Sequence, residues 1–343
     1  MDNGREPVTG LGERSRVVVA GAGSIGCFVG GGLAAAGRDV RFLARPRMVE
    51  ELRRCGLTLT DRDGGNWHLA GEGLSVGSDP ALLATAELVL VTVKSGATAE
   101  MGATIAAHAP PGAVVVSLQN GVDNVEVLRR ALPGRRVVAG MVPFNVVHLG
   151  EGRFHRGTDG DLMVEAGVPG LRAALAGKGF GVAEHPDMTA VAWGKLLLNL
   201  NNALNALSGL PLREQVGQRA WRRVLAACMT EALAALTVAG ISPAPVGRVR
   251  PGLMPTILRL PDPLFRLIAG AMLRIDPAAR SSMWEDLEKR RPTEIDHLQG
   301  AVVALAERVG RDAPVNRRVR DLVRAAERDQ AGPPRLDPRT VMG

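Results

Sequence analysis

The chain lacks tyrosine altogether, and aromatic residues make up only 3% of its 343 residues. Proteins that bind nucleic acid usually combine dense basic stretches with aromatic rings on which bases stack. The formal net charge of +7 would suit such a partner, but this charge is spread along the chain and becomes denser only near the C-terminus. We therefore expect no nucleic-acid partner.

Cysteine and histidine are also scarce and scattered. The three cysteines (Cys27, Cys55 and Cys228) form no CxxC pair, and the six histidines include no HExxH sequence. These absences exclude a disulfide scaffold and a structural zinc module. We expect no metal site, and a reducing compartment such as the cytoplasm.

The uncharged run of residues 17–37 has the length of a membrane span. It is rich in glycine and divides into a β-branched stretch, a glycine turn and an Ala/Gly-rich helix. The polar segment that precedes it is too long and too acidic for the basic region of a secretory signal. We expect neither a membrane span nor a signal.

Lysine is rare in a chain that is rich in arginine. Of the 42 basic residues, the lysines are only Lys94, Lys178, Lys195 and Lys289. Such a chain uses arginine wherever positive charge alone suffices. A lysine that is kept is a candidate for a task that arginine cannot perform, such as releasing a proton.

The chain is ordinary in its hydrophobic (46%) and charged (22%) content, which suits a globular protein of about two domains. Its first half alternates short apolar strands (16–20, 39–44, 57–60, 67–69, 87–94, 113–118, 136–142, 146–149, 153–156, 161–164 and 181–184) with helices (25–37, 48–55, 97–108, 122–131 and 171–177). Buried strands in this alternation predict a doubly wound α/β parallel sheet with helices on both faces.

The second half reads as helices only, at 189–207, 215–239, 262–273, 282–291, 293–309 and 314–330, with a Pro/Gly-rich break at 243–255. We therefore expect four parts. A flexible segment (1–14) precedes an α/β domain (15–187), and an all-α domain (188–330) precedes a flexible tail (331–343).

The sequence Gly21-Ala22-Gly23-Ser24-Ile25-Gly26 lies between the first predicted strand and helix. In this position a GxGxxG sequence predicts a dinucleotide site. The first glycine permits a tight turn, the second lets the backbone approach a pyrophosphate at the helix N-terminus, and the third permits close helix–strand packing. A structural glycine turn without a nucleotide is the alternative.

Arg45 points to the kind of dinucleotide. A site for NAD would place Asp or Glu about 20 residues after the motif, but the chain reads Leu43-Ala44-Arg45-Pro46-Arg47 there. A guanidinium suits the 2′-phosphate of NADP. A solvated arginine in an arginine-rich chain is the alternative, and NADP(H) is our prediction.

Lys94 and Asn120 each lie where a predicted strand of the same sheet ends. Ligands of open α/β sheets bind at the carboxyl ends of the strands, so both side chains are candidates for the site. For Asn120, which precedes Gly121, a simple turn is the alternative.

The predicted helix 189–207 carries a polar stripe. Relative to Lys195, the helical repeat places Asn199 at about +40° and Asn202 at about −20°, so that the three share one face. Asparagine weakens a helix that has no use for it. A bound polar substrate would use these amides; interhelical hydrogen bonds are the alternative.

Two further residues read as structural when taken alone. Ser282 and Glu285 form a capping box, which predicts Ser282 as the N-cap of helix 282–291. Such an N-terminus also suits a carboxylate. Glu294 is expected in the first turn of helix 293–309, where an acid suits the helix dipole.

Together these motifs resemble the ketopantoate reductase family over about residues 15 to 330. The family's order is kept by Gly21–Gly26 with Arg45, Val93-Lys94, Gln119-Asn120-Gly121, Trp193-x-Lys195-x-x-x-Asn199, Ser281-Ser282-Met283, Thr293-Glu294-Ile295-Asp296 and Ala313-Pro314-Val315-Asn316. The helix of Lys195 and Asn199, together with Ser282 and Glu294, is the most specific part of this likeness.

The resemblance implies a Rossmann-type domain, an all-α domain and a site in the cleft between them. The reaction would be NADPH-dependent reduction of 2-dehydropantoate to (R)-pantoate, on the route to pantothenate and coenzyme A. The implied roles are a proton donor (Lys195), binding of polar groups of the substrate (Asn120, Asn199), binding of its carboxylate (Ser282), and binding of NADPH near the nicotinamide (Lys94, Asn120, Glu294).

Two departures from the family leave the exact 2-oxo acid open. Ala203 stands where a second asparagine is usual, and either Asn202 or Asn201 would replace it; Leu212 stands near another usual asparagine. The segment 243–276 is also longer than in compact members. The alternatives are a reductase of another 2-oxo acid or imine and a non-catalytic NADP-binding sensor, against which Lys195 argues. The oligomeric state is not fixed by the sequence, and a homodimer is compatible with it.

Overall fold

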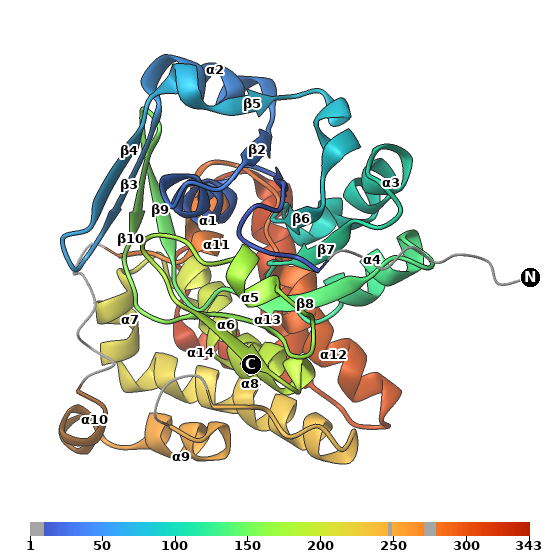
Figure 1. The fold of residues 1–343 in the computed structure, drawn as a ribbon. Coiled ribbons are helices and arrows are strands. Elements are labelled where there is room, and N and C mark those ends of the chain that lie inside the picture. Colours follow the sequence, from blue (N-terminus) through green and yellow to red (C-terminus); the bar gives the residue numbers. More distant parts are fainter. Residues whose placement is uncertain (1–9, 246–248, 271–278) are drawn as a thin grey trace, which may run out of the picture. The chain divides into compact units, whose positions relative to one another are not determined.

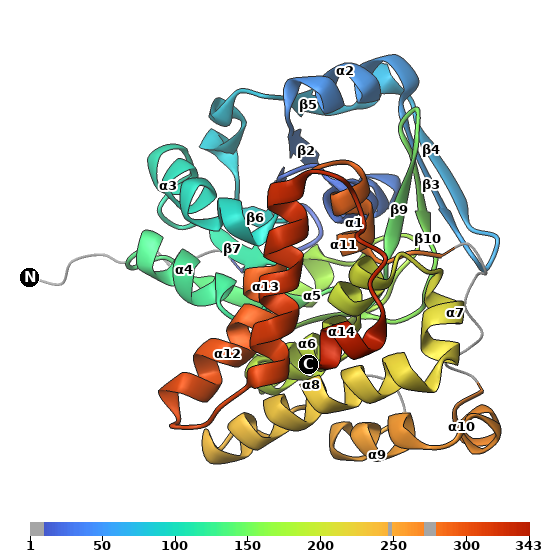
Figure 2. The same cartoon turned by 180° about the vertical axis from the view of Figure 1, so that it is seen from behind.

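The computed structural model describes residues 10–245, 249–270 and 279–343 (Figure 1; Figure 2 from behind). The chain divides into two compact units, Met1–Met188 and Thr189–Gly343. Within the described ranges, no helix is both long enough and apolar enough to cross a membrane.

The first unit is built on an eight-stranded sheet. Its strands lie in the order β12 (Val182–His185), β11 (Leu162–Glu165), β8 (Val137–Met141), β7 (Val114–Ser117), β6 (Leu88–Val91), β1 (Val17–Ala20), β2 (Val40–Leu43) and β5 (Ser75–Gly77). From β5 to β8 all neighbours are parallel, whereas β11 runs antiparallel to β8. The predicted parallel-dominated sheet is confirmed, although the sequence did not predict β5.

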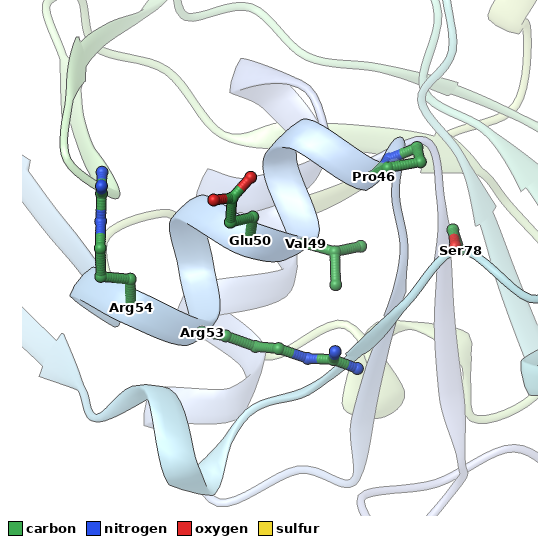
Figure 3. A pocket seen from close by; sticks show the side chains of 6 residues that line it. All are labelled: Pro46, Val49, Glu50, Arg53, Arg54 and Ser78. Carbon is green, nitrogen blue, oxygen red and sulfur yellow. The ribbon is translucent and has the colours of Figure 1, made fainter.

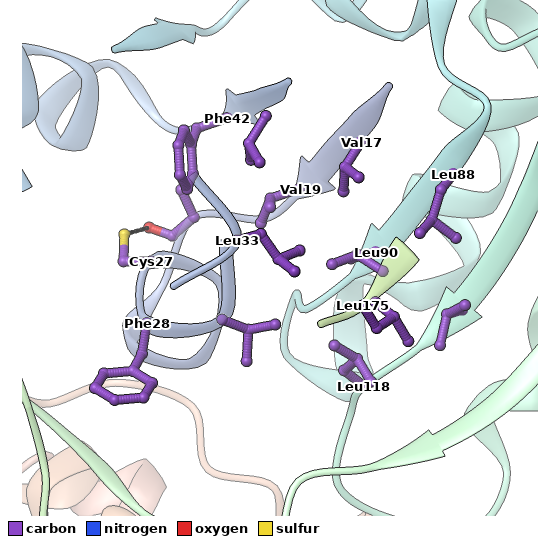
Figure 4. Packing of buried hydrophobic residues seen from close by; sticks show 14 of the residues in the cluster. Val17, Val19, Cys27, Phe28, Leu33, Phe42, Leu88, Leu90, Leu118 and Leu175 are labelled. Carbon is purple, nitrogen blue, oxygen red and sulfur yellow. Dashed lines mark hydrogen bonds between the residues drawn. The ribbon is translucent and has the colours of Figure 1, made fainter. Parts of the chain in front are cut away.

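Helices cover both faces of this sheet. They are α1 (Ser24–Ala35), α2 (Pro46–Cys55), α3 (Thr98–His108), α4 (Asn124–Ala131) and α5 (Leu171–Ala174), and the connections contain the short 3-10 helices η1 (Gly71–Gly73), η2 (Pro80–Thr85) and η3 (Ser95–Ala97). On one face Phe28 and Leu33 of α1 join strand residues such as Leu90 in the core cluster of Figure 4. On the other face Ile105 of α3 and Leu128 of α4 pack on the sheet. The central strands are apolar throughout because both of their faces are buried.

A second sheet flanks α1. It contains β4 (Asn66–Leu69), β3 (Leu57–Asp61), β10 (Arg153–Arg156) and β9 (Val146–Gly150), with β3 and β10 paired in parallel. A Cβ added at Gly30 would lie 2.6 Å from Val19 of the large sheet, and one at Gly31 would lie 2.7 Å from Leu57 of the second sheet. Glycine is therefore required where α1 is held between the two sheets.

The second unit is helical, as predicted. Its elements are α6 (Met188–Ser208), α7 (Leu212–Gly217), α8 (Arg219–Val238), η4 (Pro251–Leu253), α9 (Met254–Arg259), α10 (Asp262–Ala269), α11 (Ser282–Glu288), η6 (Ile295–His297), α12 (Gln299–Arg308), α13 (Pro314–Asp329) and α14 (Pro338–Met342). The end of predicted helix 262–273 lies outside the described residues.

Two predicted helices are interrupted. The predicted helix 215–239 is divided at Gln218, which has an extended backbone, into α7 and α8. There the buried guanidinium of Arg222 donates to the carbonyl oxygens of Val216 (3.2 Å) and Gly217 (2.9 Å), which ends the first helix. The predicted helix 293–309 is instead the turn η6 followed by α12, because Leu298 leaves helical geometry.

The expectation of a flexible tail at 331–343 was wrong. Val341 of α14 is fully buried, and the Leu336 N–H donates to the carbonyl oxygen of Leu207 at 2.8 Å. The described part of the N-terminal segment, 10–14, is also held, since Arg38 forms an ion pair with Glu13 at 3.1 Å. Residues 1–9 of that segment lie outside the described residues.

Candidate functional site

The turn between β1 and α1 leaves part of its backbone uncovered by side chains. Gly21 has φ +107°, and a Cβ added there would lie 2.5 Å from Val93. A Cβ at Gly26 would lie 2.5 Å from the Gly21 carbonyl oxygen, which accepts a hydrogen bond of 2.6 Å from the Thr92 hydroxyl. At Gly23, the N-cap of α1, nothing lies within 4 Å of such a Cβ. This geometry fits a phosphate at the positive end of a helix.

Arg45 lies beside this turn. The carbonyl oxygen of Leu43, at the end of β2, accepts hydrogen bonds from the N–H groups of Gly21 (3.1 Å) and Ala22 (3.2 Å). Arg45 follows at the N-cap of α2, with its side chain exposed. Its guanidinium is thus available to a ligand bound at the glycine turn.

A surface hollow of about 570 Å³ lies along α2 (Figure 3). It is lined by Pro46, Val49, Glu50, Arg53, Arg54 and Ser78. None of the residues predicted for the site lines it, and the Arg53 guanidinium already donates to the carbonyl oxygen of Val76 at 3.0 Å. The hollow therefore does not define the site.

A buried polar network connects the loops that carry Lys94 and Asn120. The Ser95 hydroxyl donates to the carbonyl oxygen of Asn120 (3.1 Å), and the Asn124 amide donates to the Ser95 hydroxyl (3.0 Å). The Thr98 hydroxyl donates to the Asn124 side chain at 2.7 Å. The exposed Lys94 and the half-buried Asn120 are thereby fixed in one place at the carboxyl edge of the sheet. Sequence reasoning did not find Thr98 and Asn124, whose partners are distant along the chain.

In the second unit, Lys195 is half-buried on α6. Burial lowers the pKa of its ammonium to about 8, while the negative charge of Glu294 acts in the opposite direction. The carboxylate and the ammonium are therefore electrostatic neighbours. Glu294 does not lie in the first turn of an α-helix as predicted, but at the position just before the turn η6.

The asparagines of α6 fall into two groups. Asn201 exchanges two hydrogen bonds with Gln215, of 3.1 and 3.0 Å, and the buried Asn205 donates to the carbonyl oxygen of Leu210 at 2.9 Å. By contrast, among the described residues none forms a hydrogen bond with the side-chain amide of Asn199 or Asn202. Interhelical bonding thus explains the first two amides, and the second two are available to a ligand.

The predicted N-cap of α11 was wrong by one residue. Ser281, not Ser282, caps the helix, since its hydroxyl accepts from the Trp284 N–H at 3.1 Å. The same hydroxyl donates to the carbonyl oxygen of Asn202 at 3.0 Å. The spacing to Glu285 favoured Ser282, but the contacts of Ser281 with α6 determine which serine caps. Ser282 is the first helical residue, and its side chain is exposed.

Comparison with known proteins agrees with this architecture. The family model described as "Ketopantoate reductase PanE/ApbA" matches residues 17–167, and the model of that family's C-terminal part matches residues 187–327. A 2-dehydropantoate 2-reductase of Halobacterium salinarum is 30% identical over 325 residues, which are 92% of this chain and 99% of the relative.

Solved structures share the fold. A PanE/ApbA family ketopantoate reductase from Ralstonia eutropha JMP134 has a TM-score of 0.78 and 31% identity, with 92% of this chain and 99% of the other covered. D-mandelate dehydrogenase, solved with NADH and anilino(oxo)acetate, has a TM-score of 0.76 at 18% identity, with 92% and 99% covered. The chain belongs to the ketopantoate reductase family, whose members are nicotinamide-dependent oxidoreductases that act on CH–OH groups.

Proposed function

We propose that the protein is an NADPH-dependent reductase that converts 2-dehydropantoate to (R)-pantoate, a step towards pantothenate and coenzyme A. The observation that carries the proposal is Lys195, an ammonium with a pKa of about 8 on the helix face that also bears Asn199 and Asn202. An amine with this pKa can release a proton near neutral pH, which arginine cannot.

The residues of the first unit fit the cofactor. The turn Gly21–Gly26 would hold the pyrophosphate at the N-terminus of α1, and Arg45 the 2′-phosphate of the ribose. Lys94 and Asn120, together with Glu294 of the second unit, would bind near the nicotinamide. NADPH, when bound, would supply a hydride to the carbonyl carbon of the substrate. The choice of NADPH over NADH rests on Arg45 and on the absence of an acid at the end of β2.

Lys195 would complete the reduction. As the carbonyl carbon becomes tetrahedral, negative charge develops on its oxygen and must be neutralised in the transition state. The ammonium donates its proton to this oxygen, which becomes the hydroxyl of the product, and the lysine is left as a neutral amine. A free lysine has a pKa of about 10.4, so burial makes Lys195 the stronger acid of the two.

The remaining polar groups of the second unit would bind the substrate. Ser282 would hold its carboxylate, and the amides of Asn199 and Asn202 its other oxygens. The Asn201 side chain already forms two hydrogen bonds with Gln215. Asn202 is therefore the better replacement for the asparagine that is missing at position 203.

One observation favours a second candidate, a reductase of a different 2-oxo acid or imine. Ala203 is fully buried, and Leu212 offers no polar side chain. A substrate hydroxyl that other family members bind through asparagines at these positions would thus have fewer partners here. A non-catalytic NADP-binding sensor is the candidate from another class, and it has no use for an acidic lysine.

A substrate panel tests the proposal. The purified protein is mixed with NADPH and with 2-dehydropantoate, other 2-oxo acids and imines, and nicotinamide absorbance is followed. Faster consumption with 2-dehydropantoate than with any other compound is the expected result. A preference for a different acid would favour the second candidate, and no consumption with any of them would favour the sensor. The cytoplasmic location and the homodimer expected from the sequence stay predictions.

A further inference from the structure

We propose that Asn205 is a positioning residue, which holds Ser282 at the substrate-binding face of α6. The inference deepens the proposed function, since it rests on Ser282 as a group that binds the substrate carboxylate. Asn205 lies one turn beyond Asn202 on α6 and is 0% exposed, so it does not itself contact a substrate from solvent.

Both ends of the Asn205 amide are used. Its oxygen accepts a hydrogen bond of 2.9 Å from the backbone N–H of Ser281, and its nitrogen donates one of 2.9 Å to the carbonyl oxygen of Leu210. The Ser281 N–H belongs to the N-cap residue of α11, and the bond to Asn205 spans 76 positions of the chain. The amide therefore connects the start of α11 to the end of α6.

A second hydrogen bond also holds Ser281 to α6. The Ser281 hydroxyl donates to the carbonyl oxygen of Asn202 at 3.0 Å while it accepts from the N–H of Trp284. Ser281 is thus held to α6 through its N–H and its hydroxyl, and Ser282 follows it directly in the chain. With both bonds in place, the backbone of Ser282 is held beside the part of α6 that carries Asn202.

Removal of the Asn205 amide would take these partners from the buried N–H of Ser281 and from the half-buried carbonyl oxygen of Leu210. A buried N–H without a partner is destabilising, and α11 can avoid that cost by moving away from α6. Such a shift would misplace Ser282 but leave Lys195, two to three turns earlier on α6, in its own surroundings. The expected signature is weaker binding of the 2-oxo acid, with the turnover number and NADPH binding little changed.

The test is a double-mutant cycle with N205L and S282A in the full chain, with KM for the 2-oxo acid, KM for NADPH and kcat measured for each variant. N205L is expected to raise KM for the acid about tenfold. In the S282A background the same change is expected to add almost nothing, because the group that Asn205 positions is already absent.

N201L is the matched control, since it also removes an amide with two hydrogen bonds from α6 but breaks the link to Gln215 instead. Its KM for the acid is expected to stay near that of the parent. Should N205L fail to fold, N205S, whose side chain is too short to reach both partners, takes its place. Thermal melting shows that each variant is folded.

Four results are decisive. A raised KM in S282A combined with an unchanged KM in N205L would overturn the positioning role alone. If N205L raised KM for the acid as much in the S282A background as in the parent, or if N201L raised it equally, Asn205 would act only through general stability. Either result would overturn the positioning role. An unchanged KM in S282A would instead show that Ser282 does not bind the substrate, so that the assignment made under the proposed function fails and the role of Asn205 fails with it.

Discussion

The carboxylate of Glu294 opposes the effect of burial on the ammonium of Lys195. Burial lowers the pKa of that ammonium to about 8, and the negative charge of Glu294 raises it. The two influences act on one proton, which the proposed reaction transfers to the substrate. Both side chains belong to the second unit, so this relationship does not depend on how the two units are arranged.

The pH dependence of the reduction follows from this pair. In the proposed reaction the protonated form of Lys195 is the donor, so kcat/KM for the 2-oxo acid is expected to fall as the pH rises through about 8. The variant E294Q removes the influence that raises the pKa, so its rate is expected to fall at a lower pH. An unchanged midpoint in E294Q would show that the titrating group is not Lys195, or that Glu294 does not act on it.

Removal of the amine itself should abolish most of the turnover. General acid catalysis typically contributes about 10²–10⁴-fold, and K195A is expected to lose a factor in that range. K195R should lose as much, since a guanidinium keeps the charge but does not release its proton. NADPH binding, followed by the fluorescence of the nucleotide, should be nearly intact. Turnover that survives in K195A would rule out the proton-donor role.

Replacement of Arg45 should weaken the binding of NADPH but not that of NADH. A hydrogen bond to a charged group contributes about 1.5–3 kcal/mol, so R45A is expected to bind NADPH about 10- to 100-fold more weakly. NADH, which has no 2′-phosphate, should be little affected. R54A, an exposed arginine near the other end of α2, is the control and should change neither affinity. Equal losses for both dinucleotides in R45A would contradict a 2′-phosphate site.

Alanine at Gly26 should lower the stability of the fold, whereas alanine at Gly23 should lower the affinity for NADPH. At Gly26 the new Cβ would lie 2.5 Å from a backbone oxygen, so G26A is expected to destabilise the fold by about 1–3 kcal/mol. At Gly23 it would meet no protein atom within 4 Å, so G23A should keep its melting temperature but lose affinity for NADPH. Calorimetry of both variants checks this. Unimpaired NADPH binding in G23A would show that the pyrophosphate does not lie there.

A substitution in the C-terminal helix α14 should change the free energy of unfolding. Val341 is 0% exposed, so V341A is expected to destabilise the fold by up to about 3 kcal/mol. V238A, at an exposed position near the end of α8, should stay within about 0.5 kcal/mol of the parent. Urea denaturation measures both. Equal stabilities of V341A and the parent would mean that the C-terminal segment does not stabilise the fold.

Features with a local physical cause were predictable from the sequence. The turn Gly21–Gly26 was found because a tight approach of backbone to backbone excludes side chains there, and the helical repeat alone placed Lys195, Asn199 and Asn202 on one face of α6. The strands of the second sheet were also found, as short strands of the first half. Their pairing was not, because β3 and β10 are far apart along the chain and nothing local selects a partner.

Features decided by tertiary contacts were missed. Ser281 and Ser282 are both good capping residues, and only contacts with α6, through Asn202 and Asn205, select Ser281. The Pro-rich composition of the tail suggested looseness, yet the Val341 side chain is buried and the Leu336 N–H bonds to Leu207. The division of α7 from α8 likewise depends on the Arg222 guanidinium, whose carbonyl partners could not be read from the local pattern.

The confinement of α1 between two sheets has a consequence for how a dinucleotide would be recognised. Because close contacts on opposite sides already hold α1, the helix would lose little conformational entropy when a phosphate binds at its N-terminus. The diphosphate would then dock on a rigid platform with a small entropic penalty, common to every nucleotide that carries this group. In the proposed function, discrimination between cofactors would then rest on the exposed Arg45 at the N-cap of α2, so that a substitution there would alter the preference without disturbing the platform.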